Sequence, residues 1–385
     1  MAAFALRCRG LVFTVPVLCL LFAAGCPVAP PTLDDYLRTQ LRRMNVPGMA
    51  ACIVKDNEVL WSGGYGWANI EDQSPATPDT LFMLASVSKT VTGTALMQLK
   101  EAGQLNLDDD INDYLPFPVR NPSHPQVPIT FRTLLAHTSS IRDDYTTLLP
   151  LYTQGDSPIT LADFVQGYLA PGGQWYHAGR NFLDEPPGSN WTYSNVGMTL
   201  AGYLVEVVSG MPFDAYCEAH IFAPLGMDRA AWHLAGLDPA DVAMPYRGGL
   251  LGRFVPYGHY GYPDYPDGQL RASVNEFAAI LGAFANGGEW NGNPILAPET
   301  VAEMLSIPYP SLTGDQALVW RYVDYGGQRA PAHGGGDRGV TTDVFFVPDE
   351  HIAVAVFTNG EVSGAGAWQA FGAVERRLLA KARGE

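Results

Sequence analysis

Cysteines and basic residues are scarce in this sequence. It has 5 cysteines in 385 residues, too few for a scaffold held together by disulfides. Lys and Arg number 23 against 39 Asp and Glu, which gives a formal net charge of −16 and a pI near 4.8. This acidic balance, with no basic run to offset it, excludes nucleic acid as the partner.

Two signatures of hydrolytic enzymes are also absent. No H-E-x-x-H occurs and the 8 histidines are scattered singly, so we expect no metal site and no cofactor. No G-x-S-x-G occurs either, which excludes a Ser-His-Asp enzyme with the α/β-hydrolase fold. The chain also lacks an internal repeat, a heptad pattern or a low-complexity tract.

The first 25 residues have the pattern of a signal peptide. Arg7 and Arg9 form a positive segment, and an apolar run from Leu11 to Ala24 follows. Because Pro16 breaks this run and the run is short, it does not suit a membrane span. The sequence therefore predicts export, to a bacterial periplasm or cell surface.

The residues Ala-Ala-Gly before Cys26 resemble a bacterial lipobox, although Ala stands where Leu is commonest. We expect lipidation of Cys26 and membrane anchoring through it, followed by a Pro-rich tether over residues 26–32. The alternative is ordinary signal cleavage nearby, with Cys26 as an incidental thiol.

Cys52 and Cys217 then remain, either as a disulfide or as buried free thiols.

The remaining composition indicates a globular chain with a large core and long ordered loops. Hydrophobic residues make up 47%, and Gly (41) and Pro (30) exceed their usual share. Strand patterns lie near both ends, at residues 49–54, 58–64, 344–347 and 352–357, and helical patterns fill most of the middle. This order predicts an α/β domain built from both termini and interrupted by a mainly helical domain.

The predicted α/β domain comprises residues 33–100 and 290–385. Residues 101–289 form the predicted mainly helical domain with long loops. Two local signals support the element assignment: Asp56-Asn57 is typical of a hairpin turn, and the capping box beginning at Ser273 predicts a helix start.

The segment Ser86-Val87-Ser88-Lys89 opens a predicted helix with apolar residues at a 3.6-residue period. Residues three apart on a helix share a face, with about 5–6 Å between their Cβ atoms, so the Lys89 amine reaches the Ser86 hydroxyl. A lysine takes the serine proton only when it is itself deprotonated. Burial disfavours the ammonium, and we expect the pKa of Lys89 to fall toward the roughly 7–8 of such lysines. The alternative is an exposed lysine one turn after an ordinary helix-start serine.

A second motif is Tyr193-Ser194-Asn195, which directly precedes a predicted helix over residues 196–209. A phenol near cationic groups has a lowered pKa and transfers protons, which suits Tyr193 for the leaving atom. Asn195 can donate to a substrate carbonyl and accept from Lys89. Taken alone, such a triplet also occurs by chance.

A third motif, His333-Gly334-Gly335-Gly336, precedes the predicted strands near the C-terminus. Glycines let a substrate backbone approach closely, and the free N–H of Gly336 could complete an oxyanion hole with that of Ser86. A phosphate loop is excluded because no Lys-Ser/Thr and helix follow. A plain Gly-rich turn is the alternative.

Taken in this order, the three motifs resemble those of the serine β-lactamase and penicillin-binding-protein superfamily, for which S-x-x-K is a known signature. Their spacing and the Tyr-x-Asn triplet resemble class C β-lactamases and the esterase and D-peptidase relatives of those enzymes. The flanking segments 135–139, 222–227 and 343–348 also resemble the corresponding segments of this superfamily. The resemblance covers residues 33 to 380. It implies an α+β fold, an α/β sandwich whose central antiparallel sheet is flanked by helices, with the inserted mainly helical domain.

The resemblance also implies an exported serine hydrolase that forms a covalent acyl-enzyme on Ser86 with a small-molecule acyl substrate. Lys89 and Tyr193 would share the proton transfer, and Asn195 would position the substrate. The amides of Ser86 and Gly336 would form the oxyanion hole, beside the glycines of the third motif. No metal or cofactor is implied, and no oligomeric state follows.

The sequence departs from the family pattern at two positions. His333 stands where β-lactamases have Lys, and Ser140 stands where many relatives have Gly. The first departure favours an esterase or D-amino-peptide hydrolase over a true class C β-lactamase. Arg338 is near enough in sequence to supply the missing charge. A catalytically inactive surface binding protein is the remaining alternative.

Three other features are open. His137 is expected to be a structural histidine with satisfied hydrogen bonds. The aromatic segments 175–191 and 246–265 either border the site as apolar walls or pack on their own aromatic residues as surface loops.

Overall fold

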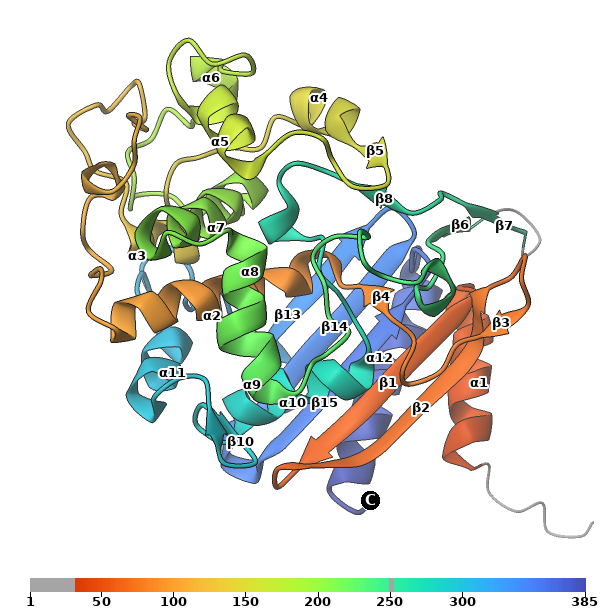
Figure 1. Cartoon of the computed structure of the whole chain (residues 1–385). Coiled ribbons are helices and arrows are strands. Elements are labelled where there is room, and N and C mark those ends of the chain that lie inside the picture. Colours follow the sequence, from red (N-terminus) through yellow and green to blue (C-terminus); the bar gives the residue numbers. More distant parts are fainter. Residues whose placement is uncertain (1–31, 249–252) are drawn as a thin grey trace, which may run out of the picture.

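The computed structural model describes residues 32–248 and 253–385. The two ends of this described part come together in one layered unit, and the middle of the chain lies beside it (Figure 1). The predicted signal peptide, residues 26–31 of the tether and Cys26 lie outside the described residues, so what the sequence predicts for them stays a prediction.

A central sheet of seven antiparallel strands runs in the order β12-β13-β14-β15-β1-β2-β3. Cys52 of β1 pairs with Ala355 of β15, so segments from the two ends of the chain share the middle of the sheet. The strands are β1 (Gly48–Lys55), β2 (Glu58–Asn69), β3 (Ser74–Pro75), β12 (Arg321–Asp324), β13 (Arg329–Asp337), β14 (Val340–Val347) and β15 (Ile352–Thr358). The predicted α+β class with a central antiparallel sheet is confirmed.

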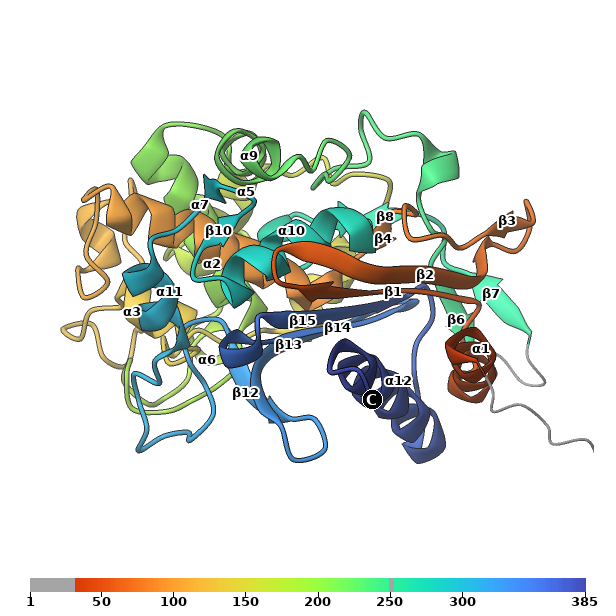
Figure 2. The same ribbon diagram turned by 90° about the horizontal axis from the view of Figure 1, so that it is seen from below.

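Helices cover both faces of this sheet (Figure 2). On one face lie α1 (Leu33–Met44) and α12 (Ala365–Ala382), which share an apolar core with the sheet. On the other face lies α10 (Val274–Ala285), which packs against β1 and β15. The α10 helix is apolar nearly all round and almost wholly buried, because it separates the sheet from the helical part.

Local signals fix the ends of these helices. Thr32 and Asp35 form a capping box at the start of α1, and Asn45 ends the helix in the left-handed region at φ 55°. Ser273 caps α10 through the predicted capping box with Glu276. Asp56 and Asn57, at φ 50° and 64°, form the predicted hairpin turn.

The helical part surrounds α2 (Ser88–Glu101), which packs against α7 (Asn195–Ser209). Its other helices are α3 (Phe131–Leu135), α4 (Tyr145–Leu148), α5 (Leu161–Leu169), α6 (Ala178–Asn181), α8 (Phe213–Cys217), α9 (Ala223–Leu225) and α11 (Pro298–Leu305). Four two-stranded ribbons link the loops: β4 (Phe82–Met83) with β9 (Arg271–Ala272), β5 (Thr153–Gln154) with β8 (Tyr260–Gly261), β6 (Tyr246–Gly248) with β7 (Phe254–Pro256), and β10 (Glu289–Trp290) with β11 (Asn293–Pro294).

Two elements differ from the sequence-based expectation. Strand β2 continues to Asn69, because residues 65–69 still pair with the start of β1 and with β3. The glycines of the third motif lie inside β13, paired with β14, and do not form a turn before the strands.

The division into domains at residues 101 and 289 stays a prediction, although α10 packs on the sheet. Cys52 and Cys217 are both free and buried.

Candidate active site

Ser86 lies in a tight turn directly before α2. Residues Ala85–Val87 form one 3₁₀ turn, and Ala85 has φ 47°, a conformation that is strained for a residue with a Cβ. The turn is held from two sides. Thr342 of β14 donates its hydroxyl to Leu84 O at 2.7 Å, and Ser88 Oγ accepts the N–H of Leu270 at 3.2 Å. The second serine of the motif is therefore structural, and Ser86 is the serine presented to the site.

Lys89 is completely buried one turn beyond Ser86. Its Nζ donates to Ser86 Oγ at 3.0 Å and to the main-chain oxygen of Asp267 at 2.6 Å. The same Nζ lies 5.1 Å from the ring centroid of Tyr193. The structure thus brings together the three residues that the sequence proposed for catalysis.

The expected lowering of the pKa of Lys89 is wrong. Burial alone lowers this pKa, but the interactions of Lys89 with Tyr193, Asp267 and Asp143 outweigh burial and raise it above its ordinary value. The pKa of Asp267 is itself raised to about 7, mainly by burial, and Lys89 opposes that rise. Lys89 is therefore an ammonium at neutral pH, which donates to Ser86 Oγ and does not take its proton.

Asp143 and Asp267 are functional neighbours that the sequence analysis missed. Asp143 accepts the N–H of Asn195 at 2.8 Å and of Val196 at 3.1 Å, and the hydroxyl of Ser194 at 3.0 Å. A carboxylate there satisfies the free amides at the start of α7 and holds the second motif in place. Both aspartates come from loops with no periodic pattern, so no local signal marks them.

His137, which the sequence predicts to be structural, contacts Tyr193 and the residues on both sides of it. The carbonyl of His137 accepts the N–H of Thr192 at 2.8 Å, and its Nδ1 accepts the N–H of Ser194 at 3.2 Å. Its ring packs against that of Tyr193, with 4.3 Å between the centroids. His137 therefore holds the residues on both sides of Tyr193.

Ser140, where many relatives have Gly, has φ 63°, a conformation that favours glycine. Its hydroxyl accepts the side-chain amide of Asn121 at 3.0 Å, a bond that glycine could not make. This hydrogen bond offsets part of the backbone strain.

Asn195 does not contact Lys89 as expected. Its side-chain amide donates to Tyr145 Oη at 3.3 Å. The ammonium already has Ser86, Asp267 and Tyr193 as neighbours for its three protons, so no donor is left for Asn195. A role for Asn195 in positioning the substrate stays a prediction.

The third motif runs along β13 beside the Ser86 turn. Strand β12 pairs with β13 only as far as Ala332, so residues 333–337 have no β12 neighbour. A side chain at Gly335 would lie 3.2 Å from the amide nitrogen of Ser86 and would collide with Leu84 O. Gly335 is thus required for close approach of the strand to the nucleophile. The oxyanion role of the Gly336 amide stays a prediction.

His333 is buried, with 7% of its surface exposed. Burial, followed by the charge of Lys89, lowers the pKa of His333 to about 4. Its Nδ1 lies 2.9 Å from the carbonyl of Gly334, which can only accept, so the proton of the neutral ring is on Nδ1. His333 therefore contributes no positive charge at neutral pH.

A cavity of about 400 Å³ opens beside Ser86. Its walls include His137, Trp191, Tyr193 and His333, and Arg321 reaches its rim. The guanidinium of Arg321 is paired with Asp315 at 2.7 Å.

Arg338, by contrast, turns away from this cavity and stacks over Tyr152 at 4.5 Å. Among the described residues of the two aromatic segments, only Trp191 lines the cavity. Tyr260 and Tyr262 instead pack with Tyr152 and with each other.

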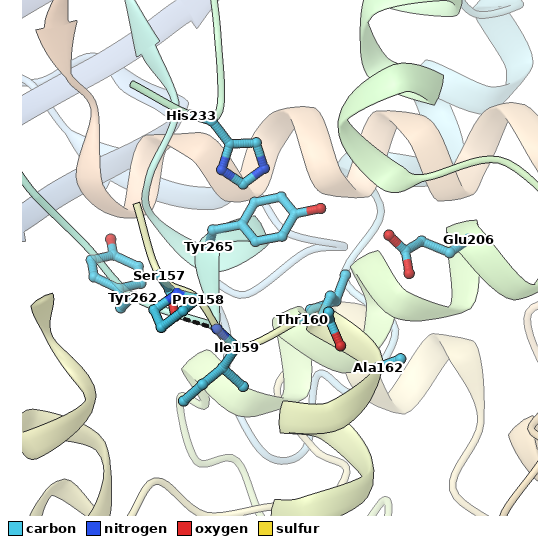
Figure 3. A pocket seen from close by; sticks show the side chains of 10 residues that line it. Ser157, Pro158, Ile159, Thr160, Ala162, Glu206, His233, Tyr262 and Tyr265 are labelled. Carbon is cyan, nitrogen blue, oxygen red and sulfur yellow. Dashed lines mark hydrogen bonds between the residues drawn. The ribbon is translucent and has the colours of Figure 1, made fainter. Parts of the chain in front are cut away.

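A second cavity, of about 270 Å³, lies near the start of α5 (Figure 3). Its walls include Ser157, His233 and Tyr265. The hydroxyl of Ser157 accepts the N–H of Ile159 at 3.2 Å and has no lysine beside it. This cavity contains none of the motif residues and is not the candidate site.

Within residues 32–248 and 253–385, no three His, Cys, Asp or Glu side chains gather as metal ligands. No single helix in this part is long and apolar enough to cross a bilayer. Only the bent pair Asn195–Ser209 and Phe213–Leu225 passes such a test, by length and composition.

The antiparallel sheet, with the Ser86–Lys89 pair at the start of a buried helix beside it, is the arrangement of the β-lactamase fold. The chain belongs to the β-lactamase family, whose sequence model matches residues 33–374.

Three comparisons show proteins to which this chain is similar in sequence or in fold. The putative penicillin-binding protein PbpX of Bacillus subtilis is 30% identical over 201 residues, which are 52% of this chain and 45% of PbpX. This chain thus spans less than half the length of that relative. The octameric penicillin-binding protein homologue from Pyrococcus abyssi has a TM-score of 0.70 at 26% identity, over 90% of this chain and 77% of the other. The D-amino acid amidase from Ochrobactrum anthropi has a TM-score of 0.71 at 22% identity, over 91% and 99%, and shares the fold.

Proposed function

We propose that this protein is an exported serine hydrolase that forms a covalent acyl-enzyme on Ser86, with small esters or D-amino peptides and amides as substrates. The observation that carries the proposal is the contact of 3.0 Å between Lys89 Nζ and Ser86 Oγ, inside a buried site that also contains Tyr193. An inactive binding protein would not need to keep a buried ammonium on a serine hydroxyl, since burying a charge is costly.

The charge of Lys89 determines how the residues divide the work. As an ammonium, Lys89 donates to Ser86 Oγ and favours the negative charge that grows on this oxygen. Tyr193, reacting in its phenolate form beside the same ammonium, takes the Ser86 proton as Oγ forms a bond to the substrate carbonyl carbon. The amides of Ser86 and Gly336 hold the carbonyl oxygen as it becomes an oxyanion.

The second half of the reaction reverses the proton transfer. Tyr193 returns its proton to the leaving oxygen or nitrogen as the bond to the acyl carbon breaks, which leaves the ester of Ser86. Water then loses a proton to Tyr193 and attacks the same carbon, and Tyr193 passes this proton to Ser86 Oγ as the bond between Oγ and the acyl carbon breaks, which releases the acid and restores the Ser86 hydroxyl. The leaving group and the attacking water use the same side of the site, next to Tyr193.

The charge distribution disfavours substrates with a carboxylate, which every penicillin and cephalosporin carries. His333 is neutral, Arg338 is directed elsewhere, and Arg321 is already paired with Asp315. The acidic side chains of Asp143 and Asp267 lie near Lys89 and raise its pKa. Uncharged or cationic substrates are therefore preferred over β-lactams. The fold shared with a D-amino acid amidase is consistent with this preference.

A fluorophosphonate probe, followed by mass mapping, tests the acyl-enzyme chemistry. We expect one label on Ser86, loss of the label in Ser86→Ala, and retention in Ser88→Ala, the matched control in the same motif. A wild-type protein that is folded and unlabelled would favour the inactive binding protein. A panel of an ester, a D-amino amide, a D-peptide and a β-lactam then identifies the substrate class. β-Lactam turnover as fast as the best other substrate would favour a true class C β-lactamase.

The cellular location is part of the same proposal. The signal-peptide pattern and the Ala-Ala-Gly-Cys26 sequence support export and lipid anchoring, with residues 26–32 as the spacer between membrane and enzyme.

A further inference from the structure

The cavity beside Ser86 contains an acidic side chain that the mechanism above does not use. Asp343 of β14 lines this cavity together with Ser86, His333 and Gly334. It also lines a neighbouring cavity of about 330 Å³, whose other walls come from β13 and α12. The two cavities share Gly334 and Asp343, so they adjoin at this carboxyl group.

The sheet keeps Asp343 near the nucleophile and accessible. Gly335 lies against the amide nitrogen of Ser86. Its neighbour in β13, Gly334, pairs with Asp343 of β14. A side chain at Gly334 would lie 3.2 Å from Asp343 Oδ1 and would cover part of it. Because glycine stands there and β12 pairs with β13 only as far as Ala332, the Asp343 side chain stays partly exposed.

Asp343 is a carboxylate at pH 7.5 and has no cationic partner. Burial raises the pKa of Asp343 to about 6, and hydrogen bonds from Glu375 and Tyr325 limit this rise. The Tyr325 hydroxyl donates to Oδ2 at 2.5 Å. Glu375 of α12 donates a proton, because burial and the charge of Asp343 raise the pKa of Glu375 well above its ordinary value.

Two donors do not saturate this carboxylate, which has about four acceptor positions. No lysine, arginine or histidine among the described residues forms an ion pair with Asp343. A negative charge that is this deeply placed and lacks a cation is costly unless a ligand supplies one.

The neighbouring cavity also suits a cation. Trp368 and Phe371 of α12 line it, and Trp368 has 52% of its surface exposed. The faces of aromatic rings attract ammonium groups. Gly336 adds no side chain, and the space where its Cβ would lie is open. An accessible carboxylate in the cavity of the nucleophile, beside an aromatic wall, indicates a place for a positively charged part of the substrate.

We propose that Asp343 is a specificity-determining residue whose carboxylate binds an ammonium group of the substrate. This inference rests on the proposed function and makes it more specific. The favoured substrates are esters and amides with a primary ammonium several methylenes from the scissile bond. From Gly335 to Asp343 the path is one residue along β13 and one strand across, roughly 6 Å between Cα atoms, which a chain of about five methylenes spans.

Two matched pairs of esters test this inference, with the ammonium on the acyl part or on the alcohol part. Methyl 6-aminohexanoate is compared with methyl heptanoate, and 6-aminohexyl butanoate with heptyl butanoate, so that a methyl group replaces the ammonium in each pair. Rates are followed by release of acid at pH 7.5, and each kcat/KM is divided by the hydroxide-catalysed rate constant of the same ester.

The quantity compared is the ratio of the ammonium ester to the alkyl ester within a pair. In at least one pair we expect this ratio to be about tenfold higher in the wild type than in Asp343→Asn. Tenfold is near the lower end for a charge-assisted hydrogen bond, because Asp343 is partly exposed. Ratios that are the same in the wild type and in a folded Asp343→Asn variant, in both pairs, overturn the inference.

The matched control is Glu375→Gln, in the other acidic side chain of the same cavity. Asp343→Asn removes the charge and keeps an oxygen that accepts from Tyr325. Glu375→Gln changes a residue that is already neutral, and its amide N–H replaces the carboxyl proton as donor to Asp343. We expect Glu375→Gln to keep the wild-type ratio. An equal fall of the ratio in both variants would show a general disturbance of this part of the sheet and would overturn the inference.

Labelling of Ser86 distinguishes failure of this inference from failure of the proposed function. A wild-type protein that neither takes the fluorophosphonate label nor hydrolyses any of the esters overturns both. A labelled, active protein whose ratios do not depend on the charge of Asp343 overturns this inference alone. If Ser86 is labelled and no ester is hydrolysed, the labelling rates of 6-aminohexyl and heptyl fluorophosphonates replace the ester rates in the same comparison. If melting curves show that Asp343→Asn is unfolded, Asp343→Thr, which is uncharged and suits a strand, takes its place.

Discussion

The substitution His333→Lys tests whether the third motif sets the preference against β-lactams. The pKa of His333 is about 4, so at pH 7.5 the imidazole is neutral in nearly every molecule. The carboxylate of a cephalosporin then finds no charge at this position, and the Arg321 guanidinium on the rim is already paired with Asp315. A lysine at position 333 would introduce the missing charge.

The size of the effect follows from two opposing contributions. A charge-assisted hydrogen bond to the carboxylate is worth about 1.5–3 kcal/mol, which is roughly a 10- to 150-fold gain in kcat/KM. Against this, the new ammonium would lie in a buried place beside Lys89, and repulsion between them lowers the pKa of both. We therefore expect a gain of about tenfold, near the lower limit, and a lower melting temperature.

The assay compares a chromogenic cephalosporin with p-nitrophenyl butanoate at pH 7.5. Wild type should prefer the ester, His333→Lys should gain about tenfold on the cephalosporin and lose activity on the ester, and the neutral control His333→Gln should gain on neither. The reasoning is refuted if a folded His333→Lys variant shows no change in the ratio of the two substrates. An equal gain in His333→Gln, or wild-type turnover of the cephalosporin that matches the ester, would refute it as well.

Three further predictions concern the proton path, the buried charges and the anchor. Lys89→Ala and Tyr193→Phe should each lower kcat/KM for the ester about 10²- to 10⁴-fold, and the double variant should lose less than the product, since both residues serve one path. Wild-type kcat/KM in Tyr193→Phe would contradict its role. Because burial raises the pKa of Asp267 to about 7 in the folded protein, its carboxyl binds a proton there at pH values where the unfolded chain, with an ordinary pKa of 3.8, has lost it. The free energy of unfolding of the wild type should therefore fall as pH rises from about 4 to 7. The Asp267→Asn variant has no carboxyl at this position, so its free energy of unfolding should rise relative to that of the wild type over this range, by up to about 4 kcal/mol. Urea unfolding at pH 4.5 and pH 8 measures this, and an equal difference at both would speak against a buried titrating carboxyl. Cys26→Ser should move the protein from the membrane to the soluble exported fraction, and an unchanged distribution with no lipid mass on Cys26 would rule out the anchor.

The sequence alone determined the features that depend on short-range geometry. Ser86 and Lys89 are three residues apart where a helix begins, and residues at this spacing meet in the 3₁₀ turn before α2 as they would on the predicted helix. The Asp56-Asn57 turn and the capping box at Ser273 likewise depend on neighbouring residues. The strand patterns at both ends of the chain, separated by helical patterns, predicted one sheet built from both termini, and β1 does pair with β15.

Only the tertiary structure decided the electrostatics of the site. The direction of the Lys89 pKa depends on the balance between burial and the charges of Asp143 and Asp267, which come from loops far away in sequence. The same holds for which arginine reaches the cavity: Arg321, and not Arg338, lines its rim, because the chain turns after β13 and carries Arg338 over Tyr152. The proton of His137 is on Nε2 only because Ser194 occupies Nδ1. Charges and hydrogen-bond partners act through space, so residues from distant parts of the chain decide them, and no local pattern records which residues those are.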